Sequence, residues 1–150
     1  MIHWVFGGSA VGKKRFINCA MENTSRFWFA PDLRREWYED GEMDPDTLAL
    51  LASLSPIIVR WQWGRENVMT AIIEKYPVIQ HEIVVCKVMP SVQVRRVIQR
   101  EGALKWDERG LIRECEDVDW LVQRLSMNYR LPVRYIDATD EYEKIPRVQP

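Results

Sequence analysis

The chain has 150 residues, of which 47% are hydrophobic, and a formal net charge of −1. This length suits one domain core, and the balanced charge gives no reason to expect binding to nucleic acid or a membrane surface through overall charge. The three cysteines, Cys19, Cys86 and Cys115, lack C-x-x-C spacing, which argues against a disulfide framework or a zinc site. No apolar run approaches a membrane span. We therefore expect a single cytoplasmic domain over residues 1–150.

Short apolar runs alternate with helical patterns along the chain, which is typical of a parallel sheet wrapped by helices. The predicted strands span residues 2–6, 27–30, 57–62, 83–88 and 133–137. The predicted helices span residues 13–21, 44–53, 65–76, 92–100 and 117–129. The strands are almost continuously apolar rather than alternating, as expected when helices cover both faces of a sheet.

A glycine-rich turn follows the first predicted strand. Gly7 and Gly12 are five positions apart and Lys13 comes next, which matches the phosphate-loop pattern G-x-x-x-x-G-K-[ST] up to its last position. Such a loop holds phosphate with inward-pointing backbone N–H groups and the positive end of the following helix. The strand before it and the helix after it favour a working loop over a chance turn. The predicted phosphate-binding residues are Gly7, Gly8, Ser9, Ala10, Val11, Gly12, Lys13 and Lys14.

Lys14 stands where a phosphate loop normally has the hydroxyl that ligates Mg²⁺. The third predicted strand also offers no carboxylate near its end. Three interpretations stay open. Mg²⁺ is held mainly by the phosphates of ATP with Asp32 or Ser9 assisting, or Lys14 places a second positive charge near the phosphates, or Lys14 points outward.

Three stretches occur in order along the chain: GGSAVGKK, FAPDLRREW and VRRVIQREGALKWDERG. With them the chain resembles the small P-loop kinases of the nucleoside and nucleotide kinase group. The resemblance implies an α/β, three-layer P-loop NTPase fold with a five-stranded parallel sheet of order 2-3-1-4-5 and a short lid over about residues 91–115. It also implies ATP and Mg²⁺ as cofactors. The implied reaction moves the γ-phosphoryl group of ATP to a hydroxyl or phosphate of a nucleoside-like or nucleotide-like acceptor.

The resemblance suggests roles for particular side chains. Lys13 is predicted to be catalytic, together with the lid pair Arg96 and Arg100, which lie on one helical face and can neutralise charge in the transition state. Arg95 and Arg109 are further lid candidates. Asp32 ends the second strand and is the candidate base, with a helix N-cap as the competing role. The predicted acceptor-binding residues are Arg34, Arg35, Trp37, Trp63 and Arg65.

A narrower hypothesis is a phage-type kinase that phosphorylates 5-hydroxymethyluracil in DNA, since the seven tryptophans would suit a flipped base. No motif specifies this acceptor. A different class is a nucleotide-binding regulatory protein with little or no catalysis, which the missing Mg²⁺-ligating hydroxyl suggests. A third is a structural domain whose glycine turn binds nothing. The sequence specifies neither the acceptor nor the oligomeric state.

Overall fold

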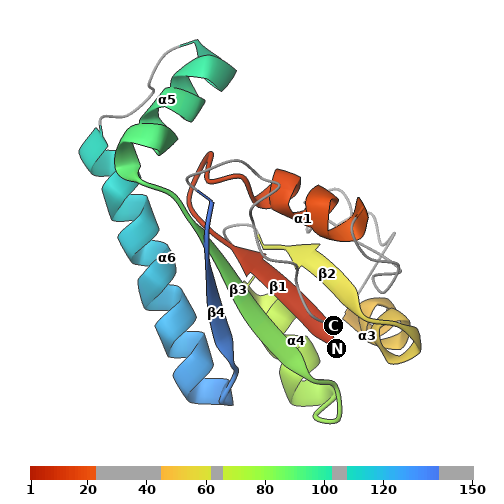
Figure 1. Cartoon of the computed structure of the whole chain (residues 1–150). Coiled ribbons are helices and arrows are strands. Elements are labelled where there is room, and N and C mark those ends of the chain that lie inside the picture. Colours follow the sequence, from red (N-terminus) through yellow and green to blue (C-terminus); the bar gives the residue numbers. More distant parts are fainter. Residues whose placement is uncertain (23–44, 62–65, 103–107, 139–150) are drawn as a thin grey trace.

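The computed structural model describes residues 1–22, 45–61, 66–102 and 108–138. In chain order the elements are β1 (Ile2–Phe6), α1 (Lys13–Glu22), α3 (Pro45–Leu54), β2 (Ile57–Arg60), α4 (Glu66–Lys75), β3 (His81–Lys87), α5 (Pro90–Glu101), α6 (Glu108–Tyr129) and β4 (Val133–Asp137). Strands and helices alternate, and every described strand pair is parallel. The predicted α/β class is confirmed (Figure 1).

The described strands form one sheet in the order β2-β1-β3-β4. The prediction of five strands in the order 2-3-1-4-5 therefore differs from the sheet that the structure describes, which has four strands. The predicted strand over residues 27–30 lies outside the described residues. When the strand over residues 27–30 is left out of the predicted order, the other four predicted strands follow the order β2-β1-β3-β4 of the structure. β1 is central, so the loop that follows it emerges from the middle of the sheet.

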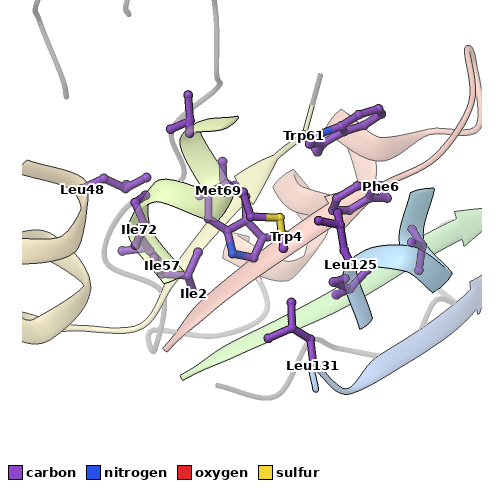
Figure 2. Packing of buried hydrophobic residues seen from close by; sticks show 14 of the residues in the cluster. Ile2, Trp4, Phe6, Leu48, Ile57, Trp61, Met69, Ile72, Leu125 and Leu131 are labelled. Carbon is purple, nitrogen blue, oxygen red and sulfur yellow. The ribbon is translucent and has the colours of Figure 1, made fainter. Parts of the chain in front are cut away.

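Side chains of the strands alternate between the two faces of the sheet, and each face has its own apolar cluster. On one face, Trp4 and Phe6 of β1 pack with buried residues of α3, α4 and α6 (Figure 2). The rings of Phe6 and Trp61 stack there with centroids 4.7 Å apart. On the other face, Val5 packs with Phe16 and other residues of α1. The helices thus cover both faces and complete three layers.

His81 and His3 are buried in the sheet, and within the described ranges neither belongs to a group of side chains that could hold a metal ion. Trp4 Nε1 donates a hydrogen bond to His81 Nδ1 at 3.0 Å. Burial lowers the pKa of His81 to about 4, so its imidazole is neutral near pH 7. Burial also lowers the pKa of His3, whose Nδ1 lies 3.3 Å from Glu82 Oε1. Both histidines therefore belong to the packed sheet.

The predicted lid range, 91–115, contains most of α5 and the first third of α6, with residues 103–107 outside the described part. α5 begins at Pro90, a residue suited to the first turn of a helix, and ends at Glu101, after which Gly102 caps it in the left-handed region with a φ of 80°. Figure 1 shows α5 beyond the carboxyl ends of the strands, near the loop after β1. α6 begins nine residues before its predicted start. No helix in the described ranges is both long and apolar enough to cross a membrane.

Candidate functional site

The loop between β1 and α1 is compact. Ala10 and Gly12 both have positive φ, 57° and 93°, and the N–H of Phe16 bonds the carbonyl of Gly12 at 2.8 Å, so α1 continues directly from the loop. A Cβ on Gly7 would lie 2.5 Å from Val11 Cγ2 and 3.0 Å from the Cys86 carbonyl oxygen, which leaves no room for a side chain. The strand, loop and helix therefore have the arrangement that the glycine spacing predicts.

Lys13, the first residue of α1, points back over this loop. Its Nζ donates hydrogen bonds to the carbonyl oxygens of Gly7 and Gly8, each at 2.9 Å. Burial lowers the pKa of Lys13, and among its charged neighbours Glu114 raises that pKa while Arg60 and Arg100 lower it further. A bound anion would favour the charged form of this ammonium.

A cavity of about 690 Å³ opens at the N-terminus of α1. None of its lining residues is acidic, and six are basic: Lys13, Lys14, Arg15, Arg60, Arg96 and Arg100. They come from α1, from the end of β2 and from α5. Ala10, Gly12 and Gln99 complete the lining. Because cationic side chains surround the positive end of a helix, the cavity attracts anions. We call it the cationic cavity.

The structure brings the predicted lid pair to this cavity. Both Arg96 and Arg100 line it. Arg96 Nη2 donates to the carbonyl oxygen of Ala138 at 2.9 Å, and its Nη1 lies 3.4 Å from that of Val11. These contacts tie α5 to the glycine loop and to the end of β4.

Other predicted site residues lie elsewhere. Arg95 and Arg109 are exposed, and neither lines the cationic cavity. Their predicted lid role gains no geometric support in the described part of the chain. The remaining predicted residues lie outside the described residues, so that their roles stay predictions: Asp32, Arg34, Arg35, Trp37, Trp63 and Arg65.

A second, smaller cavity of about 180 Å³ borders the glycine loop at Gly7 and Gly8. Its lining combines the backbone of Gly7 and Gly8 with residues from the end of β3, the start of α5 and the middle of α6. Lys87 and Asp119, which both line it, form an ion pair at 2.7 Å. Lys13 lines the cationic cavity, and its ammonium bonds the carbonyl oxygens of Gly7 and Gly8, two residues that line the smaller cavity.

Glu114 of α6 contacts the glycine loop and was not predicted from the sequence. Its carboxylate accepts hydrogen bonds from the backbone N–H of Ser9 and from Ser9 Oγ, the latter at 3.0 Å. Gln93, which is buried, donates to the carbonyl oxygen of Ser9 at 2.7 Å. Glu114 is 105 positions from Ser9 in the sequence, so no local pattern could have revealed the contact. An acidic side chain thus already occupies one backbone donor of the loop.

The thiols near the site are not activated. Burial raises the pKa of Cys86 to about 12 and also raises that of Cys115. Cys19, Cys86 and Cys115 are all free, as the sequence predicts. Thiolate chemistry at Cys86 or Cys115 near pH 7 is therefore disfavoured.

The fold matches those of solved kinase structures. A gluconokinase from Sinorhizobium meliloti 1021 aligns with a TM-score of 0.55 and 16% identity, over 95% of this chain and 85% of that one. A sugar kinase from Janibacter sp. HTCC2649 aligns with a TM-score of 0.56 and 14% identity, over 95% and 88%. No protein-family model matches the sequence, and no curated protein matches it. At such identities the likeness shows a shared fold, the α/β fold of these kinases.

Proposed function

We propose that the protein is an ATP-dependent phosphotransferase. The observation that carries the proposal is the cationic cavity, in which a glycine loop, a helix N-terminus and six basic side chains meet. This is the environment that a triphosphate requires, because its charge must be neutralised and its outer phosphate oriented. The kinase fold supports the same conclusion, since both compared structures are kinases.

Three side chains bind the donor phosphates in this proposal, and each has its own role. Lys13 releases the loop carbonyls and binds the outer phosphates, where it stabilises charge that builds up during transfer. Arg96 and Arg100 approach the same phosphates from α5 and neutralise the equatorial oxygens. Because Arg96 is also anchored to Val11, movement of α5 and the shape of the loop are coupled. Asp32 remains the proposed base for the acceptor hydroxyl.

The smaller cavity is the proposed acceptor site. It is lined by Gly7 and Gly8, whose carbonyl oxygens accept hydrogen bonds from Lys13, and Lys13 also lines the cationic cavity. At about 180 Å³ it is smaller than the roughly 300 Å³ of common ligand pockets. This size favours a compact hydroxylated acceptor, such as a sugar, a sugar acid or the sugar of a nucleoside. Asp119 and Glu116 offer carboxylates, and Gln93 an amide, to bind its hydroxyl groups.

Two other predictions enter the test as competing outcomes. A hydroxymethylated pyrimidine in DNA gains no support from the compared structures. A nucleotide-binding regulator with little catalysis is favoured by one observation, which is Lys14 in the place of a Mg²⁺-ligating hydroxyl. Both hypotheses predict ATP binding. They differ in the fate of the γ-phosphoryl group, which the DNA kinase transfers to DNA and the regulator does not transfer.

The test incubates the full chain with γ-labelled ATP and separate acceptor pools: sugars with sugar acids, nucleosides, nucleotides, and DNA containing 5-hydroxymethyluracil. Label transfer to a small hydroxylated acceptor supports the proposal. Transfer to DNA alone would replace the proposed acceptor with the DNA base. ATP binding without transfer to any pool would favour the regulator.

A pair of lysine variants links any transfer to the site. Lys13→Ala removes the ammonium at the loop and is expected to abolish transfer. Lys75, at the end of α4, lines neither cavity and pairs with Asp46 on the surface. Lys75→Ala removes an equal charge and is expected to leave transfer unchanged. Equal transfer by parent and Lys13→Ala would refute the assignment of the site.

A further inference from the structure

The described residues that line the cationic cavity lack the oxygen ligands that Mg²⁺ requires. Mg²⁺ prefers octahedral coordination by carboxylate, hydroxyl, carbonyl or water oxygens. Among the nine lining residues, no side chain carries a carboxylate or a hydroxyl, and only Gln99 offers an amide oxygen. Lys14 holds the loop position that normally supplies the hydroxyl. Within the described ranges, no group of three or more His, Cys, Asp or Glu side chains could hold a metal ion.

Of the two residues expected to assist a metal, Asp32 lies outside the described residues, and Ser9 is unsuited. Ser9 has the nearest loop hydroxyl in the sequence, but its Oγ is hydrogen-bonded to Glu114 at 3.0 Å. β2 ends in Arg60, where a carboxylate would be needed, and Arg60 lines the cavity. The side chains that the described part of the chain places around the cationic cavity therefore do not fit a protein-held Mg²⁺.

The charge that a metal would supply is already present in the protein. Mg²⁺ contributes two positive charges to a triphosphate, and Lys14 and Arg60 contribute two at the positions where its usual protein ligands would stand. Lys13, Arg15, Arg96 and Arg100 surround the same space. These cations repel one another when no anion is present, and the lowered pKa of Lys13 has contributions from Arg60 and Arg100. A highly charged anion relieves this repulsion.

On the basis of the proposed function, we infer that the cationic cavity binds its triphosphate as the metal-free anion. Lys14 and Arg60 then supply the charge that Mg²⁺ usually brings. The preferred ligand class is then a free nucleoside triphosphate or inorganic polyphosphate. Complexation of the phosphates by Mg²⁺ lowers their charge and adds a cation to a site that already holds six, so that it opposes binding.

Calorimetric titration of the full chain tests this inference. ATP and inorganic tripolyphosphate are each titrated in buffer freed of divalent cations by a chelating resin, and again with Mg²⁺ in excess. We expect both ligands to bind without Mg²⁺, with a Kd at least about threefold lower than with Mg²⁺ because the free anion carries more charge. Tripolyphosphate isolates the phosphate contacts from those of the base.

Variants at position 14 show whether the lysine is responsible. Lys14→Ser restores the usual hydroxyl and is expected to weaken metal-free binding by about tenfold, the loss of one charge-assisted contact. It is also expected to reverse the preference, so that Mg²⁺ strengthens binding. Lys14→Arg keeps the charge and is expected to behave like the parent. Thermal melting of each variant confirms that it is folded.

The outcomes separate the inference from the function beneath it. Binding by the parent only when Mg²⁺ is present would overturn the inference and leave the proposed phosphotransferase intact. Binding in neither buffer would overturn both. A Lys14→Ser variant that binds the metal-free ligands as tightly as the parent would also overturn the role assigned to Lys14.

Discussion

Replacing Glu114 with glutamine removes a negative charge from the glycine loop while keeping the size of the side chain. In the structure the Glu114 carboxylate accepts hydrogen bonds from the N–H and the hydroxyl of Ser9, and it lies near enough to Lys13 to affect the pKa of that lysine. A phosphate that binds the loop must compete with this carboxylate. We therefore expect Glu114→Gln to tighten ATP binding.

The magnitude follows from the type of hydrogen bond. Bonds to a charged group contribute about 1.5–3 kcal/mol and neutral ones about 0.5–1.5 kcal/mol. Changing the acceptor from a carboxylate to an amide lowers the cost of its release by about 1 kcal/mol, which is about a fivefold lower Kd. Calorimetric titration with ATP measures it. Glu108→Gln, an exposed residue at the start of the same helix, is the matched control and should leave the Kd unchanged.

One result would refute this reasoning. If Glu114→Gln binds ATP as the parent does, or more weakly, the carboxylate does not compete with phosphate. Its bonds to Ser9 would then only hold α6 against the loop, and thermal melting of the variant without nucleotide would show the loss of that attachment.

Three further predictions concern packing, pH and the arginines. Gly8→Ala should lower the free energy of unfolding by about 1–3 kcal/mol, measured by urea denaturation, because its Cβ would lie 2.8 Å from Cys115 Sγ. An unchanged urea midpoint would contradict this prediction, because it would mean that α6 shifts to make room for the methyl group without loss of stability. The unfolded chain protonates His81 near its ordinary pKa of 6.5 and the folded chain only near 4, so stability should fall as the pH drops from about 6.5 to 4, by at most about 3 kcal/mol. A flat stability profile between pH 6.5 and 5, where most carboxylates stay ionised, would contradict it. Arg96→Gln should weaken tripolyphosphate binding by about tenfold, whereas exposed Arg95→Gln on the same helix should not. Equal losses in both variants would point to a diffuse charge effect.

The elements with strong local patterns were predictable from the sequence. Mostly apolar runs predicted the four described strands within two residues at each end. The runs are clearest in β1 and β2, which are buried almost throughout because helices cover both faces of the sheet. The glycine spacing predicted the loop, since few other sequences allow positive φ and close backbone contacts together. The start of α6 was missed, because the first turns are charged on most faces and only Leu111 among residues 108–117 is fully buried.

Contacts between distant segments were harder to predict. The bonds between Glu114 and Ser9 depend on how α6 packs beside the loop, and nothing in either local sequence encodes that packing. Arg60 reaches the cationic cavity because it ends the strand next to β1, which only the sheet order reveals. The arginine spacing in α5 did indicate that Arg96 and Arg100 share a face, and both line the cavity.

The bonds from Lys13 to the carbonyls of Gly7 and Gly8 affect how quickly a ligand can bind. These bonds, and the bond from the Phe16 N–H to the Gly12 carbonyl, hold the loop in its folded conformation before a phosphate binds. The conformational entropy of these residues is therefore lost when the chain folds and not when the ligand binds. Association then requires the exchange of a few hydrogen bonds rather than the ordering of a loop, so the encounter rate is set by diffusion and charge.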